Sequence, residues 1–283
     1  MSTLCAEPLS DRVARLITSG ELELPPLPEL AIKLRAAVDD ESTRPADIAS
    51  LIRTEPAVAA MLLRAANSAA FGGLKAITHL TQAIGRLGIG RAQTLVTGLV
   101  AQAQFQCAPD ERNARLALWN HAVASATAAR MLAEREGYPQ ETAFVAGLLH
   151  GLGRLIVSKA LDDLETNDPE LRLTNRARDE IVEQLQFQIG YTTLKSWNLE
   201  EDVCEAARAM CPDSRRGELA ITTIVRASDV IAQKLGLHPF PDDELELMDD
   251  DAIESLDLSD IELAALLVDL EDEIEEVYAT LSA

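Results

Sequence analysis

Histidines are the side chains of this sequence best suited to acid–base or metal chemistry near neutral pH. There are four of them, His79, His121, His150 and His238. A neutral imidazole is the commonest metal ligand in proteins, although a single histidine on a helix more often serves packing. Two stand out by their surroundings, because His121 lies in the helix-like run 118–125 and His150 lies in the apolar run 143–156. We therefore take His121 and His150 as the candidate functional pair.

Other common catalytic motifs are absent from the sequence. It contains no phosphate-binding G-x-x-x-x-G-K-[ST] loop, no H-E-x-x-H and no G-x-S-x-G. Gly88-x-Gly90 lacks a preceding strand and a third glycine, so we interpret it as a turn between helices. These absences disfavour P-loop nucleotide hydrolysis, zinc proteolysis of that type and serine hydrolysis by a nucleophile elbow.

The charge distribution disfavours nucleic acid as a partner. The 283 residues include 25 Lys and Arg against 47 Asp and Glu, a formal net charge of −22, and the basic residues are scattered. Such a chain repels a phosphate backbone. Residues 241–283 hold 17 of the acidic residues and no Lys or Arg, so the acidity is concentrated at the C-terminal end.

The ends of the sequence and its cysteines bear on the compartment. The first residues lack the basic and apolar regions of a secretory signal, and no apolar stretch reaches the ~20 residues that a membrane span needs. The cysteines are far apart and form no C-x-x-C pair; they are Cys5, Cys107, Cys204 and Cys211. We expect reduced thiols in a cytoplasmic protein without a membrane partner.

Apolar residues recur with helical spacing along most of the chain, and no convincing alternation of period two is present, which predicts an all-α fold. Pro45 and Pro56 are placed as in a first helical turn. The pattern predicts helices over about 10–19, 30–38, 80–87, 91–106, 111–136, 140–150, 153–161, 178–196, 201–210 and 217–235. Pro109 and the proline-rich stretch 238–241 interrupt the helical pattern, so we expect boundaries there. The chain would then have three parts: an N-terminal helical lobe 1–108, a second helical lobe 109–240, and an acidic linker with an amphipathic helix, 241–283.

The last helix has a signature of its own. Ser259-x-x-Glu262 has the pattern of a capping box. Apolar residues then follow on one stripe: Leu263, Leu267, Leu270, Ile274, Val277 and Leu281. This stripe fits a helix that docks on its own chain, and the alternative is a short seam for a homodimer or a partner helix.

The runs 24–30, 55–69 and 77–88, with 118–125 and 143–156, carry a resemblance to a known family. The first three resemble HDOD domains, the HD-related output domains of bacterial signalling proteins, and the last two resemble the HD superfamily of metal-dependent phosphohydrolases. The resemblance spans about residues 20–235. It implies the two-lobed helical HDOD fold, in which the second lobe is a degenerate HD lobe.

The resemblance also implies a damaged metal site. His121 matches the first ligand of the HD site, His150 the histidine of the His-Asp pair, and Asp229 the late aspartate, whereas Gly151 stands where the pair's aspartate belongs. Phe187 and Met210-Cys211 fall roughly where the HD-GYP branch has further histidines. A hydrolytic pair of metal ions needs several such ligands. We therefore expect a vestigial site without a cofactor, in which Cys211 is a possible fourth ligand if a single zinc still binds. The alternative is that His121, His150 and Asp229 hydrogen-bond one another and fix helix packing.

Two functions follow from the resemblance. The first is a non-catalytic signalling module that binds a protein partner, such as a response regulator or a cyclic di-GMP-related protein, with the acidic end as a docking element. The second is a metal-dependent phosphohydrolase or phosphodiesterase with a reduced ligand set.

Overall fold

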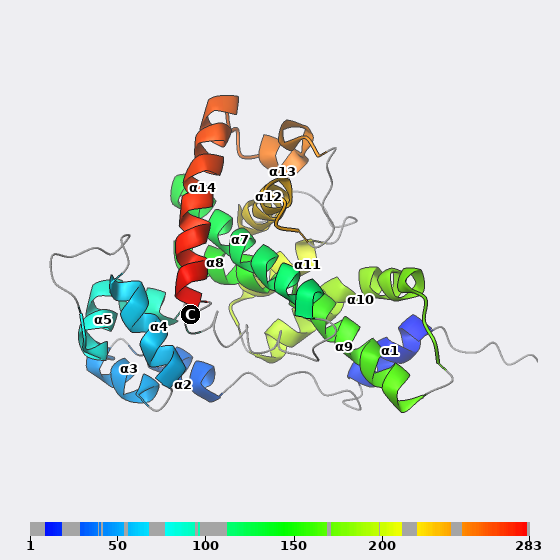
Figure 1. The fold of residues 1–283 in the computed structure, drawn as a ribbon, viewed down its shortest axis with the longest axis horizontal. Helices are drawn as coiled ribbons and strands as arrows, with labels where there is room; N and C mark the ends of the chain where they lie inside the picture. Colours follow the sequence, from blue (N-terminus) through cyan, green and yellow to red (C-terminus); the bar gives the residue numbers. More distant parts are fainter. Residues whose placement is uncertain are drawn as a thin grey trace, which may run out of the picture. The chain divides into compact units, whose positions relative to one another are not determined.

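The computed structural model is all-α, and the part of the chain that it describes contains no strand (Figure 1). The described residues are 9–18, 29–38, 40, 42–53, 56–67, 77–93, 96, 112–168, 171–197, 199–210, 220–238 and 245–281. The predicted helix 91–106 and the predicted lobe boundary at Pro109 fall largely outside them.

Two compact units make up the chain, and each is built from two separate segments. One comprises residues 1–26 and 149–222, and the other comprises residues 27–148 and 223–283. We call them the insert unit and the main unit. They differ from the contiguous parts 1–108, 109–240 and 241–283 expected from the sequence, because α1 packs on α9 and α10, and α14 packs on α7.

The insert unit is organised around α10, which packs on α9, α11 and α1. Its helices are α1 (Leu9–Thr18), α9 (Leu152–Asn167), α10 (Asn175–Ser196) and α11 (Glu201–Ala209). Helix α9 runs beyond the predicted end at 161. Its acidic last turns are stabilised by Arg178 of α10, which forms ion pairs with Asp162 and Glu165. A Cβ on Gly153 would lie 1.8 Å from the carbonyl oxygen of Gln186, so α9 and α10 touch backbone to backbone.

The main unit has α7 as its central helix. Its helices are α2 (Glu29–Val38), α3 (Pro45–Ile52), α4 (Pro56–Asn67), α5 (Leu80–Leu87), α7 (Arg112–Glu136), α8 (Gln140–Leu149), α12 (Ala220–Lys234), the short η3 (Leu247–Asp249) and α13 (Asp251–Glu254), and α14 (Asp260–Leu281). Helices α3 and α4 begin at Pro45 and Pro56, as predicted. Many of the buried residues of α7 are alanines: Ala122, Ala124, Ala126, Ala128, Ala129 and Ala133. They allow neighbouring helices to approach it closely.

Helix α14 docks on its own chain (Figure 1). It packs along α7 and also contacts α4. Leu263, Leu270 and Ile274 of the predicted stripe are buried, and the side chains of Val277 and Leu281 lie outside the description. Glu273 pairs with Arg130 of α7. Of the two alternatives left open by the sequence, docking on the same chain is the one observed, and a homodimer through this stripe would have to displace α14.

The start of α14 confirms the predicted capping box. The backbone N–H of Ser259 donates to Oε2 of Glu262 at 2.9 Å, and the N–H of Glu262 donates to Oγ of Ser259 at 3.4 Å. Two unpaired donors of the first turn are thereby satisfied.

One stretch, Gln140–Asn167, is long and apolar enough to cross a membrane by length and composition alone. Within its most apolar window, 72% is buried inside the protein. Such burial is typical of a core segment in a soluble protein, whose apolar surface is covered by its own helices.

Candidate metal centre

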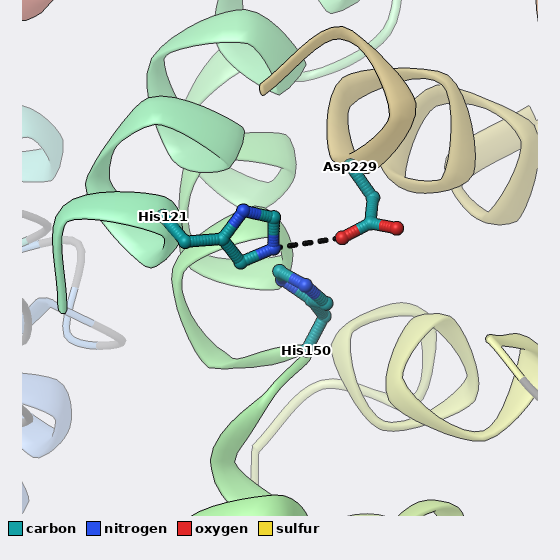
Figure 2. Close-up of side chains that lie close together, drawn as sticks. All are labelled: His121, His150 and Asp229. Atoms are coloured by element: carbon teal, nitrogen blue, oxygen red, sulfur yellow. Dashed lines mark hydrogen bonds and ion pairs between the residues drawn. The ribbon is translucent and has the colours of Figure 1, made fainter. Parts of the chain in front are cut away.

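A hydrogen bond between α7 and α12 forms the base of the site (Figure 2). The Nε2–H of His121 donates to Oδ1 of Asp229, and the two atoms are 2.8 Å apart. The His121 side chain is 7% exposed and the Asp229 side chain 21% exposed, so the pair is screened only partly from water. This is one of the packing bonds that the sequence alternative anticipated.

The third member is His150, which directly follows α8 (Figure 2). One potential ligand atom from each of His121, His150 and Asp229 lies within 4.8 Å of the others. Among the described residues, no other group of three or more His, Cys, Asp or Glu side chains has this geometry. The structure therefore brings together the three residues that the sequence selected.

Helices α7 and α8 cross closely within the main unit. Gly147 of α8 lies against Ser125 of α7, and a Cβ on Gly147 would come within 2.8 Å of the Ser125 carbonyl oxygen. His121 is one helical turn before Ser125, and His150 is nearly one turn after Gly147.

Residue 151 is the position at which the resemblance to the HD superfamily places an aspartate. Gly151 has φ −87° and ψ 2°, a conformation that residues with side chains also adopt. A Cβ there would meet no heavy atom within 4 Å. The backbone conformation and the open space around the Cβ position are compatible with a residue that has a side chain.

The donor set fits one transition-metal ion. Two imidazole nitrogens and one carboxylate are ligands typical of zinc or of non-haem iron. The same set does not fit two ions, because among the described residues the group contains no second carboxylate to bridge them. Where an ion binds, the Nε2 of His121 has to give up its hydrogen bond to Asp229, since the ring nitrogen must present a lone pair to the metal.

The remaining predicted positions add no ligand that the structure places. Cys211 lies outside the described residues, and Met210 ends α11. Phe187 lies within α10, and its ring has no lone pair to offer. The prediction that Cys211 is a fourth ligand therefore stays a prediction.

His238 is the residue that sequence reasoning passed over. Its ring contacts His121 edge to face, with ring centroids 4.7 Å apart and an interplanar angle of 88°. In the sequence it stands next to prolines, with no spacing that relates it to the other histidines. The one local signal for its position is Gly236, two residues earlier, because a glycine just after a helix can adopt the left-handed conformation that turns the chain back.

Comparison with known families gives one match. A profile of the HDOD domain matches residues 24–211. Asp229 and His238 both lie beyond that range. An uncharacterized protein of Treponema pallidum (strain Nichols) is 26% identical over 193 residues, which is 66% of this chain and 37% of that protein. The match thus spans little more than a third of that relative.

Three solved structures are similar over nearly the whole chain. A candidate metal-dependent phosphohydrolase from Shewanella amazonensis SB2B has a TM-score of 0.76 at 19% identity, covering 96% of this chain and 98% of its own. An HDOD domain protein with unknown function from Geobacter sulfurreducens has a TM-score of 0.70 at 21% identity, with coverages of 95% and 96%. A candidate signal transduction protein from Marinobacter aquaeolei VT8 has a TM-score of 0.68 at 19% identity, with coverages of 97% and 65%. At these identities the likeness concerns the fold.

Proposed function

The chain belongs to the HDOD domain family, and from that premise we propose that it is a non-catalytic module of bacterial signal transduction that acts by binding a protein partner. The observation that carries the proposal is Gly151, which leaves three potential ligands where two-metal hydrolysis needs more. The fold neighbour named as a candidate signal transduction protein is compatible with this role.

The partner we propose is a response regulator or a cyclic di-GMP-related protein of the cytoplasm. The acidic surface of α14 is the docking element in this proposal, because it turns carboxylates outward while its apolar stripe faces α7. Exposed carboxylates on this helix include Glu271, Asp272 and Glu275. Such a surface would steer a basic partner surface towards it, most strongly at low salt.

The competing function is a metal-dependent phosphohydrolase with a reduced ligand set. The observation in its favour is the convergence of His121, His150 and Asp229, and the name of one fold neighbour agrees with it. Three protein ligands and an open position for water are the usual make-up of a catalytic zinc site. An activity measurement must therefore separate the two functions.

The decisive experiment assays phosphomonoester, phosphodiester and cyclic dinucleotide hydrolysis by the full chain after incubation with Mn²⁺, Fe²⁺ or Zn²⁺. The proposal expects no turnover above that of the His150→Ala variant. Turnover in the wild type that is lost in both His150→Ala and Asp229→Ala would overturn it in favour of the phosphohydrolase.

Partner binding is tested with a variant that keeps α14 docked. Deleting α14 would uncover buried side chains of α7, so a triple change of exposed carboxylates, Glu271→Gln, Asp272→Asn and Glu275→Gln, is the better probe. We expect affinity capture of a signalling protein by the wild type and weaker capture by the triple variant, with the difference shrinking at high salt. A capture that is unchanged in the triple variant would exclude α14 as the docking element.

A further inference from the structure

We propose that His238 is the fourth protein ligand of a single transition-metal ion held by His121, His150 and Asp229. The inference goes beyond the partner-binding role and does not depend on it. It replaces Cys211 in the ligand set expected from the sequence.

The end of α12 delivers His238 to the site. Gly236 has a φ of +72°, the left-handed conformation that favours glycine. The N–H of Leu237 donates to the Ala232 carbonyl at 3.1 Å, and the N–H of Gly236 donates to the Gln233 carbonyl at 2.9 Å. These two bonds form a Schellman motif, which turns the chain back beside the helix it has just left. The same helix carries Asp229, which is hydrogen-bonded to His121. The turn therefore places His238 beside His121.

The contact between the two imidazole rings has the separation that shared coordination needs. A ligating imidazole nitrogen lies ~2.0–2.1 Å from zinc, so two rings on one ion have centroids about 5 Å apart. The centroids of His238 and His121 are 4.7 Å apart. His238 is not in the group whose ligand atoms lie within 4.8 Å of one another, so rotation about its side-chain bonds would have to bring one of its ring nitrogens to the ion.

Four protein ligands would change what the metal can do. A site of three histidines and one aspartate is closed in tetrahedral geometry, and a closed zinc site has no position left for a reactive water. His238 thus explains how a chain of this family can hold a metal without hydrolysing a phosphoester. The ion would instead clamp α7, the end of α8, and α12 with the segment that follows it.

Cobalt substitution tests the ligand set directly, because the visible absorption of Co²⁺ reports its coordination number. We would titrate Co²⁺ into metal-free full chain and measure stoichiometry, affinity and spectrum. The variants are His238→Ala and His150→Ala, and the matched control is His79→Ala, which changes an exposed histidine at the start of α5. Circular dichroism verifies that each variant is folded.

The proposal expects one Co²⁺ per wild-type chain with the intense absorption of a four-coordinate site. His79→Ala should leave the spectrum and affinity unchanged, His238→Ala should weaken binding at least about tenfold and lower the absorption, and His150→Ala should weaken it further. A wild type that binds no Co²⁺, or a His238→Ala variant indistinguishable from His79→Ala, would overturn the proposal.

A cysteine placed at position 238 supplies a second, specific readout. A thiolate bound to Co²⁺ produces a charge-transfer band in the near ultraviolet that imidazole and carboxylate ligands do not. We expect that band in His238→Cys and not in the wild type. Its absence from a folded, cobalt-loaded His238→Cys would contradict the proposal, and its presence in the wild type would assign the fourth ligand to a native cysteine such as Cys211. None of these results depends on whether a partner is captured.

Discussion

Gly147 on α8 lies against Ser125 on α7 so closely that a Cβ on residue 147 would stand 2.8 Å from the Ser125 carbonyl oxygen. It would also stand 2.9 Å from the Cα of Ala126. Both neighbours are backbone atoms of α7, and they cannot move aside as the end of a flexible side chain can. The close approach of α7 and α8 therefore rests on the missing side chain at residue 147.

Gly147→Ala is expected to lower the free energy of unfolding by about 1–3 kcal/mol, the usual cost of forcing a methyl group into a packed interior. Urea unfolding followed by circular dichroism measures the change. Gly85→Ala on α5 is the matched control, because a Cβ there meets no heavy atom within 4 Å. We expect that variant to be neutral or more stable, since alanine favours helix by about 1 kcal/mol over glycine. Equal destabilisation of the two variants would show that the α7–α8 crossing is not tight.

Gly151→Asp should restore a ligand without disturbing the fold. The backbone angles at residue 151 suit a residue with a side chain, and the position of its Cβ is open. The added carboxylate supplies negative charge beside His150, so we expect Mn²⁺ or Zn²⁺ affinity to rise at least about tenfold, measured by isothermal titration. Gly151→Asn has the same size without the charge and should bind as the wild type does. If the two variants gain affinity equally, the carboxylate is not acting as a ligand.

Leu270→Asp tests the docking of α14. Leu270 is 0% exposed, whereas Val268 on the same helix is 63% exposed. A carboxylate at residue 270 loses the apolar contacts with the body and is itself left in an apolar setting, so the free energy of unfolding should fall by roughly 3 kcal/mol or more. Val268→Asp should change it little. Light scattering on both variants reports their mass. A halved mass of Leu270→Asp with unchanged stability would show instead that the stripe holds a dimer together.

The start of α14 should respond to pH through Glu262. Its hydrogen bonds with Ser259, and then the charge of Arg135, lower the pKa of the Glu262 carboxyl below its ordinary value. A carboxyl with a lowered pKa in the folded state stabilises that state above its unfolded pKa, near 4.3. This contribution is lost as the pH falls through the lower folded value. The protection of the first-turn amides of α14 against hydrogen exchange, measured relative to the intrinsic exchange rate at each pH, should therefore fall below about pH 4.

Ser259→Ala should produce the same loss of protection at neutral pH, because it removes the hydroxyl that Glu262 accepts from and that caps the helix. Ser255→Ala is the control, since that hydroxyl donates to the Asp251 carbonyl outside α14. A difference between wild type and Ser259→Ala that persists unchanged into acid would rule out Glu262 as the titrating partner.

The elements of this fold could be predicted because their signals are local. Pro45 and Pro56 mark helix starts because a proline lacks the backbone N–H, which has no partner within the helix at its first turn. Ser259 and Glu262 mark a third start by the reciprocal hydrogen bonds of a capping box. The metal-site residues on α7 and α12, His121 and Asp229, were identified through the resemblance of the surrounding motifs, and the structure joins them by one hydrogen bond.

What could not be predicted depends on contacts between distant segments. The stripe through Leu263 and Leu270 is the same whether it meets α7 or another chain, so no pattern distinguishes the two. His238 gives no spacing signal, because its approach to His121 depends on the left-handed turn at Gly236. That each unit consists of two separate segments of the chain was not predicted, because boundaries drawn from the sequence assume contiguous parts.

This division of each unit into two segments has a consequence for the order in which the protein folds during synthesis. Helix α1 is made before the other described helices but belongs to the insert unit, whose other helices are made only after residues 27–148. The insert unit can close once α11 has emerged, whereas the main unit waits for α14, more than a hundred residues after the helix α7 that it covers. Contacts of such high sequence separation slow folding. The nascent chain therefore carries the bare face of α7 while more than a hundred further residues are made, and it is in that interval that we expect this protein to depend most on chaperones.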